Sequence, residues 1–101
     1  MRILVVCGAG ASSTFVAQRI LRSAARRAIT ITVTPSSEAL LGSLIPGADV
    51  ILVGSHLAAR IEDIRPSAGS VPVVALPDSA FTAVSGDAAL DLALSAAQAT
   101  Q

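Results

Sequence analysis

The sequence contains no lysine, tryptophan or tyrosine, and it has one cysteine and two phenylalanines. Seven arginines balance seven acidic residues. A neutral chain with so few aromatic rings lacks the bulk charge and the stacking platforms of nucleic-acid-binding proteins, so we expect no nucleic-acid partner. A lone cysteine cannot form an internal disulfide, and no Cys/His cluster has zinc spacing. We therefore expect a reducing compartment and neither a structural metal nor a cofactor.

Long apolar runs are also missing. No stretch of about 18 uncharged apolar residues could span a bilayer, and residues 1–7 are too short for the apolar region of a signal peptide. The expectation is a cytoplasmic chain that does not itself cross a membrane. With 101 residues, 52% of them hydrophobic and 14% charged, the composition predicts one folded domain over residues 1–101.

Four short segments rich in β-branched residues, each bounded by Gly, Pro, Ser or Asp, predict strands. They are residues 2–7, 29–34, 49–53 and 71–76. The first, third and fourth are continuous apolar runs, which is typical of parallel strands covered on both faces. The second alternates Ile and Val with Thr, which predicts an edge strand with one partly wet face.

Helical segments are predicted between and after these strands, at residues 13–28, from Ser36 or Ser37 to Pro46, at 57–65 with a stop at Pro66, and at 87–99. In the first helix a buried face is predicted at Ala17, Ile20, Leu21, Ala24 and Ala28. Another face carries Arg19, Arg22 and Arg26, which are either solvated or turned toward an acidic partner. Phe15 is either the first core anchor of this helix or a docking contact near the rim.

Strands and helices that alternate in this way predict an α/β fold with right-handed crossovers. We expect a three-layer α/β/α arrangement with a four-stranded parallel sheet in the order 2-1-3-4, flavodoxin-like and phosphatase-like. Ligands of such sheets bind beyond the carboxyl ends of the strands, where the winding direction reverses. That point is the end of the first strand, at Cys7.

The segment after Cys7 combines small residues with hydroxyls: Gly8, Ala9, Gly10, Ala11, Ser12, Ser13 and Thr14. Such a loop can turn its backbone N–H groups toward an anion, and a helix N-terminus adds positive potential that favours a thiolate. The three hydroxyls can cap the helix or donate to a bound oxyanion. The alternative is a buried cysteine in a tight turn.

The same segment excludes two nucleotide-binding motifs and argues against a cysteine phosphatase. It is not GxGxxG, because residue 13 is Ser, and it is not a P-loop, because there is no lysine. A cysteine phosphatase of this layout needs an arginine six residues after the cysteine, where Ser13 stands. The cysteine is therefore better suited to passing a phosphoryl group on than to hydrolysing it.

Four further polar residues follow the third and fourth strands and form a possible rim: Ser55, His56, Asp78 and Ser79. His56, in the loop after the third strand, either meets a phosphate on Cys7 or a loop of the partner, or is an exposed loop residue without a role. Asp78 acts either as a general acid or in a turn after Pro77.

Residues 1–7 followed by 8–14 resemble the strand, CxxGxS[ST] loop and helix start of the lactose/cellobiose-type IIB components of the bacterial phosphoenolpyruvate-dependent sugar phosphotransferase system. The resemblance implies that Cys7 accepts a phosphoryl group from a phosphohistidine on a IIA partner and passes it to a sugar held by the membrane IIC component. It also implies that residues 8–14 cradle the phosphate. A low-molecular-weight cysteine phosphatase, a non-catalytic regulatory domain of the same fold and a thiol-redox protein remain as alternatives.

Overall fold

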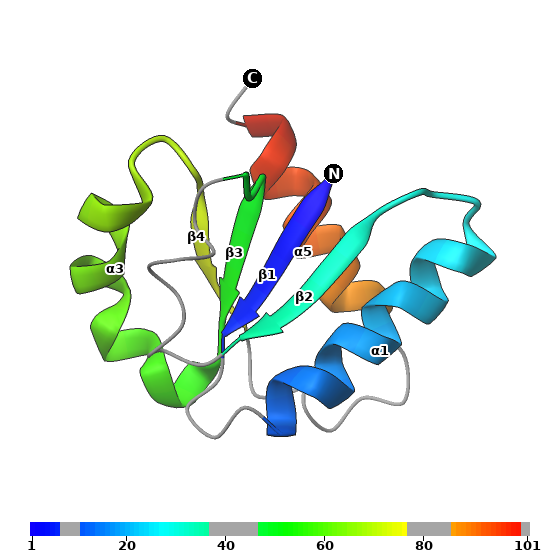
Figure 1. Cartoon of the computed structure of the whole chain (residues 1–101), viewed down its shortest axis with the longest axis horizontal. Helices are drawn as coiled ribbons and strands as arrows, with labels where there is room; N and C mark the ends of the chain where they lie inside the picture. Colours follow the sequence, from blue (N-terminus) through cyan, green and yellow to red (C-terminus); the bar gives the residue numbers. More distant parts are fainter. Residues whose placement is uncertain (7–10, 37–46, 77–85, 100–101) are drawn as a thin grey trace.

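A computed structural model describes residues 1–6, 11–36, 47–76 and 86–99. Its strands and helices alternate along the chain (Figure 1). In order, the elements are β1 (Arg2–Val6), α1 (Ala11–Arg26), β2 (Thr32–Ser36), β3 (Val50–Val53), η2 (Ser55–Arg60), α3 (Ile61–Ala68), β4 (Val73–Ala75) and α5 (Asp87–Ala99), where η2 is a 3₁₀ helix.

The four strands form one parallel sheet in the order β2-β1-β3-β4, which confirms the predicted fold class and strand order. β1 lies between two neighbours, with Val5 opposite Pro35 of β2 on one side and Leu52 of β3 on the other. β2 is an edge strand, as its alternating pattern predicts. An edge position also tolerates Pro35, which has no N–H to give to a further strand.

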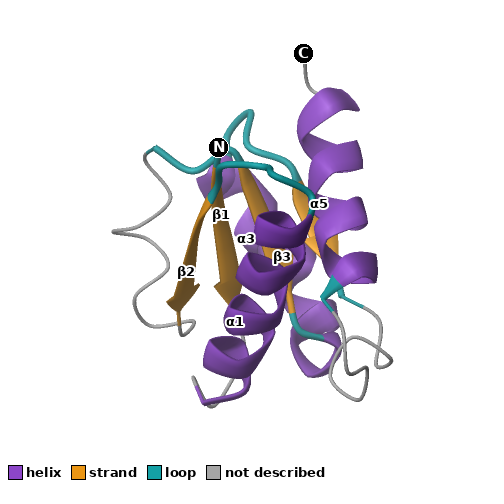
Figure 2. Cartoon of the chain, turned by 90° about the vertical axis from the view of Figure 1, so that its right-hand side faces the viewer, coloured by secondary structure: helices purple, strands orange, loops and turns teal. Residues whose placement is uncertain are grey.

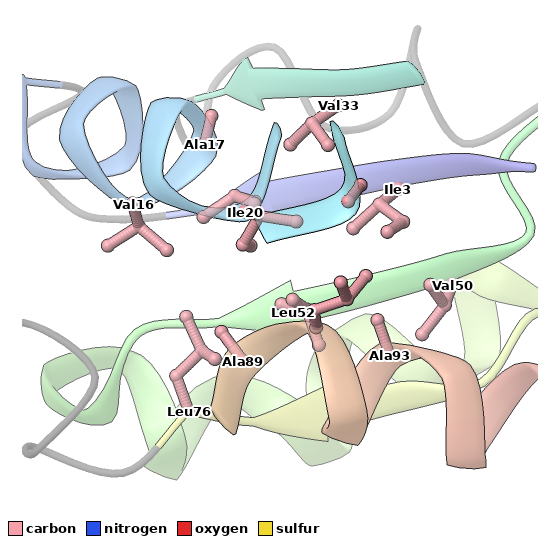
Figure 3. Close-up of a cluster of buried hydrophobic side chains, with 13 residues drawn as sticks. Ile3, Val16, Ala17, Ile20, Val33, Val50, Leu52, Leu76, Ala89 and Ala93 are labelled. Atoms are coloured by element: carbon pink, nitrogen blue, oxygen red, sulfur yellow. The ribbon is translucent and has the colours of Figure 1, made fainter. Parts of the chain in front are cut away.

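Each face of the sheet carries its own apolar cluster. Ile3 and Val5 of β1 point to the face covered by α1 and α5, whereas Leu4 and Val6 point to the face covered by η2 and α3 (Figure 2). All four side chains are at most 1% exposed. Figure 3 shows the first cluster, in which side chains of both helices meet those of β1, β2 and β3. Burial on both faces explains why β1 and β3 are unbroken apolar runs.

The first helix differs from its prediction in position and in its buried face. It covers Ala11–Arg26 rather than residues 13–28. Ala28 lies beyond it in the left-handed region at φ 57°, and the N–H of Ile29 donates to the carbonyl of Ala24 at 2.8 Å, which closes the helix end. Leu21, predicted to be buried, is 40% exposed. The buried face consists of Val16, Ala17, Ile20, Ser23 and Ala24.

β2 begins three residues later than predicted, at Thr32 rather than at residue 29. The N–H of Thr32 donates to the carbonyl of Met1 at 2.8 Å, so the pairing with β1 starts there. Ile29 and Ile31 are half-buried against the α1/α5 cluster and belong to the connection before the strand. β-branched residues in a half-buried connection give the same pattern as a strand.

The predicted helix end at Pro66 is wrong, because Pro66 lies inside α3, which continues to Ala68. Proline has no backbone N–H, so α3 lacks one helical hydrogen bond at this position. Only two helical residues follow it. Ala68 is 5% exposed and packs into the second cluster, and Gly69 then ends the helix at φ 63°. β4 is shorter than predicted, whereas α5 has the predicted bounds of 87–99. The helix expected from Ser36 or Ser37 to Pro46 falls on residues 37–46, which lie outside the described residues, and Ser36 is the last residue of β2.

Candidate functional site

The carboxyl ends of the parallel strands meet at one edge of the sheet, and α1 begins at that edge (Figure 1). β1 ends at Val6, and α1 starts at Ala11. The residues between them, Cys7, Gly8, Ala9 and Gly10, lie outside the described residues. Because Cys7 is joined directly to Val6, the described ends of β1 and α1 frame the position where sequence reasoning expects the reactive thiol.

The N-terminus of α1 supplies backbone donors at this edge. In an α-helix the N–H groups of the first turn have no acceptor within the helix, and here they include those of Ala11, Ser12 and Ser13. The first turn contains no acidic residue, so no side-chain charge there opposes the positive end of the helix dipole.

The position where α1 starts excludes one of the two roles expected for the three hydroxyls, which is capping the helix. A helix-capping residue precedes the first helical residue, whereas Ser12, Ser13 and Thr14 lie inside the helix, after Ala11. These residues are therefore not the N-cap of α1. Thr14 is exposed, which leaves its side chain accessible from solvent.

The end of β3 lies directly beside the end of β1. The N–H of Gly54, the residue after β3, donates to the carbonyl of Val6 at 2.8 Å. The carbonyl of Gly54 then accepts from the N–H of Leu57 at 2.9 Å, and this turn opens η2. Ser55 and His56 are the first two residues of η2, so the prediction of a loop at His56 is wrong. Gly54 thus brings the start of η2 to the residue that precedes Cys7.

The end of β4 follows β3 in the same way. The N–H of Leu76 donates to the carbonyl of Val53 at 2.7 Å, and the Leu76 side chain is 1% exposed. Asp78 and Ser79, predicted at this rim, lie outside the described residues. Across the described ranges, no three His, Cys, Asp or Glu side chains gather in a way that could hold a metal ion.

One position near this edge was missed by the sequence reasoning, and another was given two interpretations of which one is excluded. Gly54 is buried and forms the hydrogen bond to Val6 described above. A glycine that ends an apolar strand just before a polar pair is the signal that could have identified it. Phe15 is 61% exposed on α1, so its interpretation as a core anchor is wrong. Its place four residues before Arg19 could have put it on the arginine face.

Comparisons with known proteins give consistent results. Residues 2–92 match the family model "PTS system, Lactose/Cellobiose specific IIB subunit". A cellobiose-specific phosphotransferase IIB component from Borrelia burgdorferi is similar in structure, with a TM-score of 0.80 and 30% identity over 100% of this chain and 94% of that one.

The lactose-specific IIB component domain from Streptococcus pneumoniae shares the fold, with a TM-score of 0.84 and 16% identity over 95% of this chain and 96% of that one. No curated protein sequence matches the chain. In the described part of the chain, no helix is both long enough and apolar enough to cross a bilayer.

Proposed function

The chain belongs to the lactose/cellobiose-specific IIB family of the sugar phosphotransferase system, and from this premise we propose that Cys7 is its phosphoryl acceptor. The family membership makes the chain a phosphoryl-transfer component of sugar transport. In the proposed relay a IIA protein donates the phosphoryl group from a phosphohistidine in the cytoplasm, and the membrane IIC component presents the sugar that receives it. Residues 1–101 act as one IIB domain.

The observation that carries the proposal is the arrangement of β1 and α1. β1 ends at Val6 and α1 begins at Ala11, so in the sequence Cys7 lies between a strand end and a helix start whose first N–H groups, including those of Ala11, Ser12 and Ser13, have no acceptor within the helix. Such a helix start favours both a thiolate and a bound phosphate. We propose that the backbone of Gly8, Ala9 and Gly10 and that of residues 11–14 hold the phosphate, together with the hydroxyls of Ser12, Ser13 and Thr14.

The two steps balance without a cofactor. In the first, the Cys7 thiolate attacks phosphorus, the S–P bond forms, the N–P bond of the phosphohistidine breaks, and the electron pair returns to the imidazole. In the second, a sugar hydroxyl attacks phosphorus, the O–P bond forms, the S–P bond breaks with its electron pair returning to the Cys7 sulfur, and the hydroxyl proton passes to that sulfur or to water. Both steps depend mainly on in-line positioning and on neutralising the phosphate charge. Ser55, His56, Asp78 and Ser79 are proposed as rim contacts in these steps.

Intact-mass analysis of wild type and Cys7→Ser tests the proposal. Each protein is incubated with phosphoenolpyruvate, the general phosphotransferase proteins and a lactose/cellobiose-type IIA protein. We expect wild type to gain the mass of one labile phosphoryl group and Cys7→Ser to gain none, because the variant has a hydroxyl in place of the thiolate. Ser95→Ala, an exposed serine on α5, is the matched control and should be labelled like wild type.

Two results would contradict the relay. One is a wild-type chain that stays unmodified with every IIA protein tried, as expected of a non-catalytic regulatory domain. The other is hydrolysis of an aryl phosphate at a phosphatase-like rate, which would favour the phosphatase alternative.

A further inference from the structure

Phe15 is a large apolar side chain left in solvent close to the candidate site. It lies in the second turn of α1, and the helix begins at Ala11 at the site edge. Phenylalanine is usually buried, yet Phe15 is 61% exposed, more than any other large hydrophobic side chain in the described residues. An exposed aromatic ring of this kind is typical of an interface anchor.

Phe15 shares one side of α1 with arginines. At 100° per residue, Arg19, Arg22 and Arg26 lie at i+4, i+7 and i+11 from Phe15, so the four residues form one stripe along the helix. We call it the Phe15–arginine stripe. The opposite side of α1 packs against the sheet through Val16, Ala17 and Ile20. In Figure 2 α1 lies in front of the sheet with no described element covering its outer side.

The charge of this stripe is compensated at one end. α1 contains no acidic residue. At its C-terminal end Arg26 pairs with Asp87 of α5 at 3.5 Å. Arg22, one turn closer to the site, is exposed and forms no ion pair within the described part of the chain. The stripe therefore combines an apolar anchor, Phe15, with a positive charge at Arg22 that has no ion pair among the described residues.

We propose that the Phe15–arginine stripe docks the phosphohistidine donor, a IIA protein whose docking face carries an apolar socket for Phe15 and carboxylates for Arg22. This inference rests on the proposed function. A phosphorylated donor carries extra negative charge beside its reactive histidine, so a positive stripe on α1, the helix that begins at the site edge, attracts the charged form. A second copy of this chain is a poor occupant, because two-fold contact through the stripe would place arginines against arginines.

The test compares two stripe variants with two matched controls. Phe15→Ser removes the anchor, and Leu21→Ser makes the same kind of change at an exposed position on another side of α1. Arg22→Glu reverses a stripe charge, and Arg65→Glu gives the same net charge on α3, on the other face of the sheet. The readout is the rate of phosphoryl transfer from phosphorylated IIA protein to Cys7, followed by quenched intact-mass measurement over a range of donor concentrations.

We expect each stripe variant to lower kcat/KM about tenfold, with kcat at saturating donor within about twofold of wild type, because docking changes and the chemistry does not. Both controls should stay within about twofold of wild type. Raising the salt from about 0.05 M to about 0.5 M should reduce the Arg22→Glu effect and leave the Phe15→Ser effect in place, because salt screens charge but not apolar contact.

The outcomes separate this inference from the proposed function. If wild type is phosphorylated on Cys7 and both stripe variants match their controls, the docking surface is wrong and the relay stands. If no IIA protein labels wild type, both fail. Sedimentation provides a further check. A wild-type dimer that Phe15→Ser converts to a monomer, with unchanged transfer rates, would assign the stripe to self-association and overturn the proposal.

Discussion

The two faces of the sheet are held together by different kinds of contact. On the α1/α5 face, ion pairs connect helices that are far apart in sequence: Arg26 and Arg27 reach Asp87 at 3.5 and 3.4 Å, and Arg27 reaches Asp91 at 2.7 Å. On the α3 face, the described ion pair joins Arg65 to Glu62 within the same helix. The pairs of Arg26 and Arg27 fix the end of α1 relative to α5, whereas the Arg65–Glu62 pair stabilises α3 locally.

The glycines on the two faces show the same contrast. A Cβ on Gly86, just before α5, would lie 2.4 Å from the carbonyl carbon and oxygen of Arg19 in α1, so only glycine permits this close approach. A Cβ on Gly69, just after α3, would meet nothing within 4 Å, and that glycine instead provides a turn at φ 63°. Because α1 carries the first turn of the proposed phosphate cradle, we infer that long-range contacts of the α1/α5 face position the site.

The largest expected effect compares one core isoleucine from each face. Ile20→Ala removes a side chain that is 0% exposed between α1 and the sheet, and should lower the free energy of unfolding by about 4 kcal/mol. Ile64→Ala on α3, where the side chain is 7% exposed, should cost about 3 kcal/mol. Urea unfolding followed by circular dichroism measures both. A larger loss of unfolding free energy for Ile64→Ala would show that the core of the α3 face contributes more to stability than that of the α1/α5 face.

The second prediction concerns the close approach at Gly86. Gly86→Ala forces α5 away from the α1 backbone and should cost about 3 kcal/mol, whereas Gly69→Ala, limited to backbone strain, should cost about 1–2 kcal/mol. Both variants are then assayed for transfer to Cys7 under conditions where they remain folded. We expect Gly86→Ala to transfer several-fold more slowly than Gly69→Ala. Equal rates would show that the position of α1 against α5 does not control the site.

Much of this fold could be predicted from the sequence, because the apolar runs are unambiguous. Residues 2–7 and 49–53 have few ways to bury both faces other than as central parallel strands, and β1 and β3 occupy those positions. The buried face of α1 was harder to assign. In an alanine-rich helix, Leu21 and Val16 define alternative apolar faces of similar quality, and the sheet contacts Val16. Phe15 was given both a core and a docking interpretation, and its exposure excludes the core one.

The candidate site could be predicted in outline by one rule, that parallel strands end at a common edge. The Gly54–Val6 hydrogen bond confirms that β1 and β3 end side by side, which brings the residues after β3 to the end of β1. The close approach at Gly86 could not be predicted, because it depends on how two helices distant in sequence pack. The role of Cys7 is a prediction that the labelling experiment tests, and the rim roles of His56 and Asp78 stay predictions.

The smallest expected effect concerns the Arg27–Asp91 pair on the exposed side of the α1/α5 face. The hydrogen bond that Arg27 donates to the Asp91 carboxylate raises the pKa of Arg27, burial lowers it, and the charges of Asp91 and Asp87 raise it further. A raised pKa means that the stabilisation is fully present below the unfolded-state value and is lost only as the pH rises through the folded-state value. Between pH 6 and 9 the contribution of Arg27 should therefore be constant.

Arg27→Gln should lower the urea midpoint far less than either glycine variant, and about 1 M salt should abolish the difference in midpoint between Arg27→Gln and wild type. Arg65→Gln, which breaks a pair within one helix, is the control and should change the midpoint less still. A loss for Arg27→Gln that persists in high salt would show that packing of the Arg27 side chain, and not its charge, joins α1 to α5.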